Sequence, residues 1–271
     1  MLLIASTDRV PLLIQLSSIA STNAELVRRA EAEDLPAYTT VVTDDQTAGR
    51  GRRGRSWVAP AGTSLAISVL LRPVGSGGSA LDPSRFAWLS LAAGIAMTDA
   101  VSAVLPDDAA EINAVGFKWP NDVQIAGRKV CGVLGELLPP TGRSGGGVVM
   151  GAGINVTMST DQLPVPTATS LAIEGGVGDD LADRVLAAYL GRLIELVDGY
   201  GEHDGDADAS GLRAAAVERC TTLGRDVRAE LPGGEQLLGS AVGIDELGRL
   251  QIRTGSGRVE AVAAGDIVHL R

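Results

Sequence analysis

The stretch AVGFKWPNDVQIAGRKVCGVLGELLPPTGRSGGGVVMGAGINV, residues 114–156, decides the fold of this chain of 271 residues. Three segments within it are rich in Val, Ile, Leu and Gly and predict β-strands: 114–119, 128–138 and 147–156. Turn sequences join them at 120–122, 126–127 and 141–146. Strands with such short connections pair as neighbours, so the stretch predicts an antiparallel or mixed sheet.

Helices are predicted on the N-terminal side of this sheet. A capping box at 22–25, with Thr22 as the cap, starts a helix just after Ser21 that continues to about residue 33. The run 86–105 has Asp99 as its only charged residue, and Asp82 with Pro83 precedes it. Its length fits a membrane span, but its caps and its Ala and Gly content favour a buried core helix. Further strands are predicted at 38–43 and 64–71, and further helices at 180–200 and 212–219.

The character of the sequence changes near residue 221. Four short strands separated by Gly-containing turns are predicted at 226–231, 236–244, 250–253 and 259–263. Such a pattern is typical of a small all-β module. We therefore expect a large domain over residues 1–220 and a small one over 221–271.

Composition restricts the classes of function. The formal net charge of -10 repels nucleic acid and anionic lipid over most of the surface. Cys131 and Cys220 have no partner at a metal-ligand or redox spacing, and His203 and His269 give no basis for a zinc site or a histidine base. The N-terminus lacks the pattern of a signal peptide, so an intracellular protein is expected.

One loop concentrates positive charge in this acidic chain. Residues 49–55 read Gly-Arg-Gly-Arg-Arg-Gly-Arg, a sequence that lets backbone N–H groups and several guanidinium forks surround an anion. It also matches Gly-x-Gly-x-x-Gly, but no strand leads directly into it and no helix follows, as a dinucleotide fold requires. A flexible RNA-binding segment is the other interpretation, although aromatic residues do not interleave with the arginines.

The only two lysines among 23 basic residues are Lys118 and Lys129, and they bracket one short segment. Lysine offers a compact point charge with rotatable donors, which suits a phosphate oxygen that moves during a reaction. The segment therefore predicts an anion-handling site, although two surface lysines can also lie close together by chance. Asp122, between them, could help to hold a hydrated magnesium ion.

Two further features permit a structural and a functional interpretation. Trp57 follows the arginines and could stack on a purine or simply belong to the core. The run Gly151–Asn155 could allow close approach of a ligand to the backbone, or it could be a glycine bulge.

Taken together and in order, these motifs resemble the biotin protein ligase family. The motifs are 21–23 (Ser-Thr-Asn), Gln46 with 49–55 and Trp57, 118–122 (Lys-Trp-Pro-Asn-Asp), 128–129 with Gly132, and 151–155. The resemblance implies an α+β fold, with a mixed sheet flanked by helices as in class II aminoacyl-tRNA synthetases, followed by a small SH3-like barrel. The first motif begins at Ser21, so we expect no N-terminal DNA-binding domain and no repressor role.

The resemblance also implies the reaction and its partners. Biotin and ATP, the latter as its Mg²⁺ complex, would give biotinyl-adenylate and pyrophosphate. A lysine of a biotin carboxyl carrier domain, part of a biotin-dependent carboxylase, would then take the biotinyl group. A cytoplasmic enzyme is expected, without a tightly bound metal and without nucleic-acid or membrane partners.

Site residues follow from the same resemblance. Biotin would be bound by Ser21, Thr22, Asn23, Gln46, Arg50, Gly51, Arg52, Lys129, Gly132 and Gly151. ATP would be bound by Arg50, Arg52, Arg55, Trp57, Lys118, Asn121 and Asn155. Arg52, Lys118 and Lys129 would be catalytic, and Asp122 is the metal candidate. Loops 44–62 and 157–168 would act as lids that are mobile without ligand.

Two rival functions stay open from the sequence. A lipoate ligase uses a related architecture and the same adenylation chemistry, although the arginine-glycine loop favours biotin. A non-catalytic RNA-binding protein would use the basic loop alone.

Overall fold

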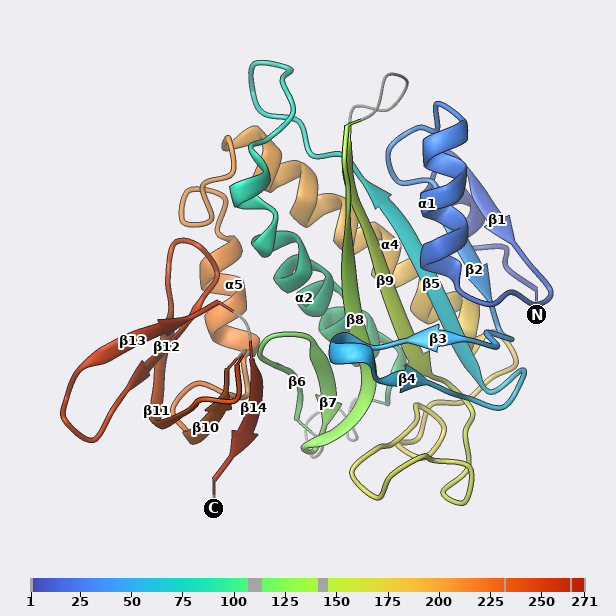
Figure 1. Ribbon diagram of the computed structural model, residues 1–271. Helices are drawn as coiled ribbons and strands as arrows, with labels where there is room; N and C mark the ends of the chain where they lie inside the picture. The colour runs from blue at the N-terminus through green and yellow to red at the C-terminus, as the bar shows by residue number, and fades with distance from the viewer. Residues whose placement is uncertain (1, 107–113, 141–145, 232, 264, 271) are drawn as a thin grey trace.

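A seven-stranded mixed sheet forms the centre of the protein (Figure 1). The structure is a computed structural model, and it describes residues 2–106, 114–140, 146–231, 233–263 and 265–270. Its strands, in spatial order, are β1 (Leu13–Gln15), β2 (Thr40–Thr43), β5 (Ser64–Leu71), β9 (Gly147–Asn155), β8 (Arg128–Leu138), β7 (Asp122–Ile125) and β6 (Val115–Lys118). Only β1 and β2 run parallel, and all other neighbours in the sheet are antiparallel. The mixed sheet is therefore confirmed.

Helices cover both faces of the sheet, because side chains alternate along each strand. On β5, Ile67 and Val69 belong to the large core beneath α2 (Ala87–Val104) and α4 (Leu181–Glu202). Leu70 faces the other way and packs with α1 (Thr22–Ala32). Ala66 and Ser68 share that second face and are small, so the sheet leaves room for a cavity beside α1.

The predicted core helix is confirmed. Among the described residues, Pro83–Val104 is the one helical segment long and apolar enough to cross a membrane, and 72% of its apolar window is buried inside the protein. It packs against the sheet, at β6 to β9, and against α4 (Figure 1). The predicted cap is also confirmed: Asp82 accepts from the Ser84 N–H and starts the 3-10 turn η3 (Pro83–Arg85), with Pro83 in the first position. The α-helix α2 itself begins at Ala87.

The start of α1 differs from the prediction by one residue. The N-cap is Ser21, whose hydroxyl accepts from the Ala24 N–H at 3.4 Å, and not Thr22. Thr22 is instead the first residue of the helix, and its hydroxyl contacts the Gln46 side chain and the Ser68 hydroxyl. A residue expected to stabilise the helix thus belongs to the site.

The loop predicted at 44–62 contains regular structure. It folds as a hairpin of β3 (Gly49–Arg50) and β4 (Ser56–Trp57), joined through the 3-10 turn η2 (Arg52–Gly54). We call residues 49–57 the arginine hairpin. Strands β1, β7 and β14 were also missing from the prediction, and the predicted turn at 141–146 lies outside the described residues except for its last glycine.

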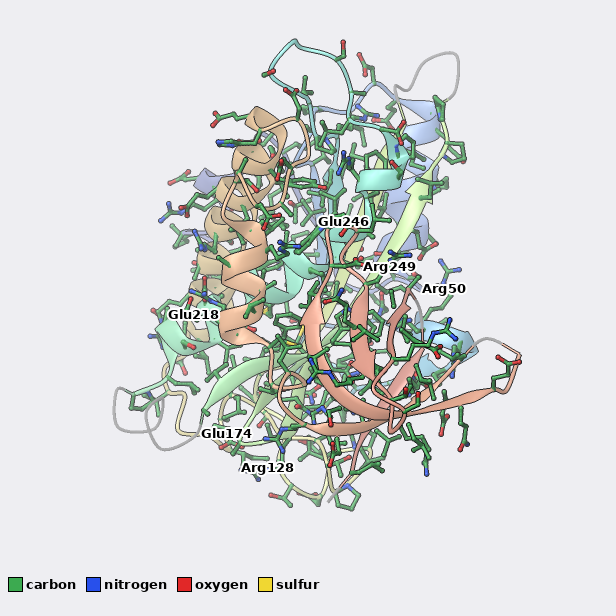
Figure 2. All side chains as sticks on the ribbon, turned by 90° about the vertical axis from the view of Figure 1, so that its left-hand side faces the viewer. Arg50, Arg128, Glu174, Glu218, Glu246 and Arg249 are labelled. Carbon is green, nitrogen blue, oxygen red and sulfur yellow. The ribbon has the colours of Figure 1, made fainter. Side chains whose placement is uncertain are left out.

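The C-terminal module follows α5 (Leu212–Arg219), a helix with the predicted bounds. Its antiparallel strands are β10 (Asp226–Glu230), β11 (Gln236–Ile244), β12 (Leu250–Arg253), β13 (Val259–Val262) and β14 (Asp266–His269). Their order is β13-β12-β11-β10-β14, and among the described residues β13 and β14 do not pair, so the barrel is not closed by hydrogen bonds. The turn between β11 and β12 carries the labels Glu246 and Arg249 in Figure 2. In it, the Glu246 carbonyl accepts from the indole N–H of buried Trp88, and the Gly248 carbonyl accepts from that of buried Trp119.

Asp183 on α4 gives a prediction about stability. Its buried carboxylate accepts from the N–H groups of Ile4, Ala5 and Ser6 and from the Ser6 hydroxyl, at 2.6–3.0 Å. Burial raises its pKa, but hydrogen bonds from the Ser6 hydroxyl and from the three N–H groups outweigh burial and lower it below the ordinary 3.8. We expect Asp183→Ala to cost about 2–4 kcal/mol at pH 7, because it leaves buried donors unsatisfied.

The pH dependence follows from the lowered pKa. A carboxyl group with a lowered folded-state pKa stabilises the protein fully above its unfolded pKa, and this contribution is lost as the pH falls through the folded value. Urea unfolding at pH 7 and near pH 3 should therefore show the larger difference between wild type and Asp183→Ala at pH 7. Equal stability of the two proteins at pH 7 would contradict this account.

Candidate active site

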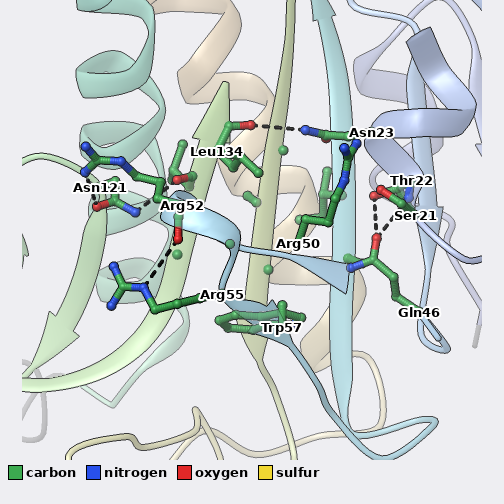
Figure 3. Close-up of a pocket in the computed structure, with 18 of the residues that line it drawn as sticks. Ser21, Thr22, Asn23, Gln46, Arg50, Arg52, Arg55, Trp57, Asn121 and Leu134 are labelled. Carbon is green, nitrogen blue, oxygen red and sulfur yellow. Dashed lines mark hydrogen bonds between the residues drawn. The ribbon is translucent and has the colours of Figure 1, made fainter. Parts of the chain in front are cut away.

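A cavity of ≈ 140 Å³ lies on the α1 face of the sheet, under the arginine hairpin (Figure 3). Its wall comes from the start of α1, from β5, β8 and β9, and from the hairpin itself. The lining includes these predicted site residues: Ser21, Thr22, Asn23, Gln46, Arg50, Gly51, Arg52, Arg55, Trp57, Asn121, Lys129, Gly132 and Gly151. Segments spread over more than a hundred residues of sequence thus meet at one place.

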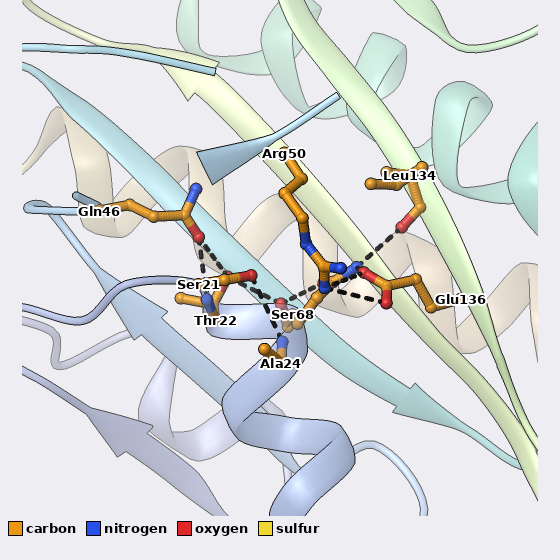
Figure 4. A network of polar contacts seen from close by, with 9 residues as sticks. Ser21, Thr22, Ala24, Gln46, Arg50, Ser68, Leu134 and Glu136 are labelled. Atoms are coloured by element: carbon orange, nitrogen blue, oxygen red, sulfur yellow. Dashed lines mark hydrogen bonds and ion pairs between the residues drawn. The ribbon is translucent and has the colours of Figure 1, made fainter. Parts of the chain in front are cut away.

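One end of the cavity is polar and fixed by hydrogen bonds (Figure 4). Gln46 accepts from the N–H and the hydroxyl of Thr22 at 2.9 and 3.1 Å. The buried Ser68 hydroxyl lies 2.8 Å from the Thr22 hydroxyl and 2.5 Å from the Asn23 side-chain oxygen. We call Ser21, Thr22, Asn23 and Gln46 the polar end.

Glycines form the floor of the cavity because other side chains approach their backbone closely. A Cβ on Gly151 would lie 2.4 Å from the Asn23 Oδ1, and one on Gly153 would lie 2.7 Å from the Trp57 ring. At Gly132 it would lie 2.9 Å from the Lys129 Nζ. Pairing of β9 with β5 and β8 is regular through these residues, so the glycine bulge is wrong and close approach is the reason for glycine here.

The opposite end of the cavity carries cations, and we call Arg52, Arg55 and Lys129 the cationic end. The Arg52 guanidinium donates to the Asn121 side-chain oxygen at 3.0 Å, and Asn121 is itself fixed by the Val133 carbonyl. The Lys129 ammonium lies 2.7 Å from Asp122 and 5.7 Å from the centre of the Trp57 ring. Trp57 therefore forms a wall of the cavity beneath a cation.

Burial shapes the charge at the cationic end. It lowers the pKa of Arg52, while Asp266 and Asp122 oppose this shift. Burial also lowers the pKa of Lys118, which Asp122 and Asp266 again oppose. Both groups are cations held in a partly water-poor place, where a charge acts more strongly on a ligand than in water.

The C-terminal module holds the outer side of the arginine hairpin. Arg55 pairs with Asp266 at 3.0 Å, and Arg53 lies 3.4 Å from the same carboxylate. Arg53 also donates to the Glu230 carbonyl at 2.7 Å. These contacts tie the hairpin to the protein and disfavour a flexible RNA-binding segment.

Three of the predicted residues do not line the cavity. Asn155 is buried and donates to the Thr169 carbonyl at 2.8 Å. Lys118 and Asp122 lie behind the cationic end, where Asp122 faces Lys129. The described residues contain no group of three or more His, Cys, Asp or Glu side chains that could hold a metal ion.

The residues of the site that sequence reasoning missed include Ser68, Leu134, Glu136 and Asp266. Glu136 lies on β8 four residues after Gly132, and alternate residues of a strand point to the same face. This spacing was a signal that Glu136 lies on the cavity face with Gly132. Asp266 gave no comparable signal, because its contact with Arg55 joins residues 211 positions apart.

The two ends of the cavity differ in chemistry. The polar end presents uncharged hydrogen-bonding groups, whereas the cationic end presents fixed positive charge (Figure 3). Such a cavity suits an elongated ligand with an uncharged polar head and an acidic tail. An additional anion could meet that tail at the cationic end.

Comparison with known proteins agrees with this chemistry. Residues 16–155 match the biotin/lipoate A/B protein ligase family, and residues 222–270 match the biotin protein ligase C-terminal domain. The chain is 38% identical to a biotin–[acetyl-CoA-carboxylase] ligase of Mycobacterium tuberculosis, over 93% of this chain and 86% of that protein. It is 34% identical to a ligase of the same name from Paracoccus denitrificans, over 90% and 95% of the two chains.

A solved structure supports the same relationship. The structure of a biotin protein ligase from Aquifex aeolicus in complex with biotin and ATP superimposes with a TM-score of 0.71 at 28% identity. The match covers 96% of this chain and 99% of that one.

Proposed function

Because the chain belongs to the biotin/lipoate A/B protein ligase family, we propose that it is an enzyme that attaches biotin to a carrier protein in two steps. Biotin and ATP first give biotinyl-5′-AMP and pyrophosphate. A lysine amine of the carrier then takes the biotinyl group and releases AMP. The cavity with one neutral and one cationic end is the observation that carries this proposal.

Biotin would lie along the cavity with its uncharged ureido ring at the polar end. Thr22, Asn23 and Gln46 supply hydrogen-bonding groups there, and Gly151 leaves space for the ring. The carboxylate would then reach the cationic end beside Lys129 and Arg52. The indole of Trp57 offers a flat surface for the adenine of ATP.

The first step joins two anions. A carboxylate oxygen of biotin attacks the α-phosphorus of ATP, the new C–O–P linkage forms, and the bond to the β-phosphate oxygen breaks as pyrophosphate leaves. Arg52 and Lys129 are held in place by Asn121 and Asp122 before any ligand arrives. Fixed cations stabilise the charge that develops on the phosphate without reorganisation during the reaction, and they align the two reactants.

Magnesium would enter as part of the ATP substrate. Mg²⁺ keeps several water ligands and binds nucleotide phosphates together with one or two carboxylates. Asp122 is the candidate acidic group for such a role, and it is already paired with Lys129. A hydrated MgATP complex thus agrees better with these residues than a protein-bound metal does.

The second step needs a neutral amine and little water. The carrier lysine attacks the carbonyl carbon of the mixed anhydride, loses a proton, and AMP leaves. The arginine hairpin covers the cavity, which protects the anhydride from hydrolysis. The carrier would be a biotin carboxyl carrier domain, and the reaction would take place in the cytoplasm. In this chain, loops 44–62 and 157–168 would act as lids over the cavity. The boundary between its two domains would lie near residue 221.

Isotope exchange between ATP and pyrophosphate tests this function. Biotin with MgATP should support exchange, and lipoate should support none, while removal of Mg²⁺ with a chelator should abolish it. Exchange with lipoate alone would show that the chain is the other type of ligase in the family. Absence of exchange with either acid would refute the proposal.

A further inference from the structure

Glu136 connects the wall of the cavity to its cover. Its carboxylate accepts from the Asn23 amide at 2.9 Å, on the polar end. Both of its oxygens also lie 3.0–3.1 Å from one nitrogen of Arg50, which belongs to the arginine hairpin (Figure 4). The side chain is therefore shared between a binding residue and the segment that closes over it.

The contacts of Asn23 fix the orientation of its amide. Leu134 and Glu136 offer only acceptors, a backbone carbonyl and a carboxylate, so the NH₂ group of Asn23 must face them. The amide oxygen then accepts from the Ser68 hydroxyl at 2.5 Å. Both amide hydrogens are occupied, and a ligand at the polar end meets Asn23 as an acceptor.

The charge of Glu136 bears on what the polar end can bind. Arg50 is half exposed, and an ion pair in such a position contributes little to folding. The ion pair does, however, offset the positive charge of Arg50 beside the carboxylate that also binds Asn23. Without Glu136, the guanidinium of Arg50 would attract a carboxylate or a phosphate to the polar end. Lys129, the expected partner of the biotin carboxylate, lies at the opposite end.

We propose that Glu136 is a positioning residue that keeps the polar end neutral and holds the Asn23 amide in its acceptor orientation. Biotin then enters in one direction only, with its uncharged ring at the polar end and its carboxylate at Lys129. This inference rests on the proposed function, because it explains why the polar end binds the uncharged ring of biotin and not an anion. It assigns Glu136 no contact with the reacting atoms.

Titration calorimetry with biotin alone, without ATP, tests the inference. In Glu136→Ala we expect biotin affinity to fall about tenfold, the usual scale for losing a hydrogen bond to a charged group. Inorganic phosphate should also compete with biotin in this variant and not in wild type. In the double variant Glu136→Ala/Arg50→Met, phosphate competition should disappear while biotin affinity stays low, because Asn23 is still unsupported.

A second variant separates the two roles of Glu136. Glu136→Gln keeps an acceptor for Asn23 and removes the charge, so phosphate competition should appear with a smaller loss of biotin affinity. Glu195→Ala is the matched control, since it removes an exposed glutamate paired with Arg192 on α4, across the sheet from the cavity. It should bind biotin as wild type does.

The outcomes are distinct. Unchanged biotin affinity in Glu136→Ala, or phosphate without effect in both Glu136 variants, would overturn the role of Glu136. Loss of biotin binding and of phosphate response together with a lowered melting temperature would do the same, because it would indicate a structural role. Wild-type protein that does not bind biotin at all would instead refute the proposed function.

Discussion

Replacing Lys129 with alanine should slow formation of biotinyl-adenylate by about a hundredfold to a thousandfold, the range found when one preorganised donor is removed from a developing anion. Lys129 lies at the cationic end, 2.7 Å from Asp122 and above the Trp57 ring. Its removal takes away positive charge from the place where carboxylate and phosphate meet, and it leaves Asp122 without that partner. Single-turnover assays of adenylate formation would measure the effect.

The fold should survive this change, because Lys129 is partly exposed and its ion pair contributes little to stability. Lys129→Arg is the matched variant: it keeps the charge, but its planar fork does not reproduce a compact ammonium, so a partial loss is expected. Circular dichroism should be the same for all three proteins. An alanine variant with the full rate of adenylate formation would remove Lys129 from the site.

Much of the fold was predictable because its segments carry strong local signals. The bounds of β5, β8 and α5 agree with the sequence patterns of alternation and capping. Strand β1 escaped prediction because it has only 3 residues and exists through its parallel pairing with β2. Strand β7 was hidden because it has only 4 residues and its first, Asp122, belongs to the predicted Pro-Asn-Asp turn.

The candidate site was predictable where a residue type is unusual for its surroundings. Lysine in an arginine-rich chain and glycine within a strand both draw attention to their positions, and the cavity contains Lys129, Gly132 and Gly151. Glutamate on a strand gives a weaker signal, since most are solvated: the alternation along β8 places Glu136 on the cavity face but does not say what it contacts. Glu136 becomes informative only when α1 and the arginine hairpin are brought to it by the fold.

A methyl group at Gly151 should weaken biotin binding by roughly tenfold to a hundredfold, which corresponds to the usual cost of overfilling a packed position. The new Cβ would lie 2.4 Å from the Asn23 Oδ1. That amide cannot move aside without losing its contacts with Ser68, Leu134 and Glu136. We expect Gly151→Ala to raise the KM for biotin strongly and the KM for ATP little.

The control for this change is Gly199→Ala on α4, where a Cβ meets no atom within 4 Å. Alanine also favours a helix over glycine, so this variant should keep full activity and unfold at the same or a higher temperature. A Gly151→Ala enzyme with the wild-type KM for biotin would show that the polar end does not bind the substrate.

A double variant decides whether the clash acts through Asn23. If the methyl group harms binding by displacing the amide, then Asn23→Ala alone already removes the group that would be displaced. Gly151→Ala/Asn23→Ala should then bind biotin little worse than Asn23→Ala, since mutations that act on one contact are not additive. Fully additive losses would mean that the methyl group blocks the ligand directly. The glycine floor of the cavity, and not Asn23, would then determine which ligand fits.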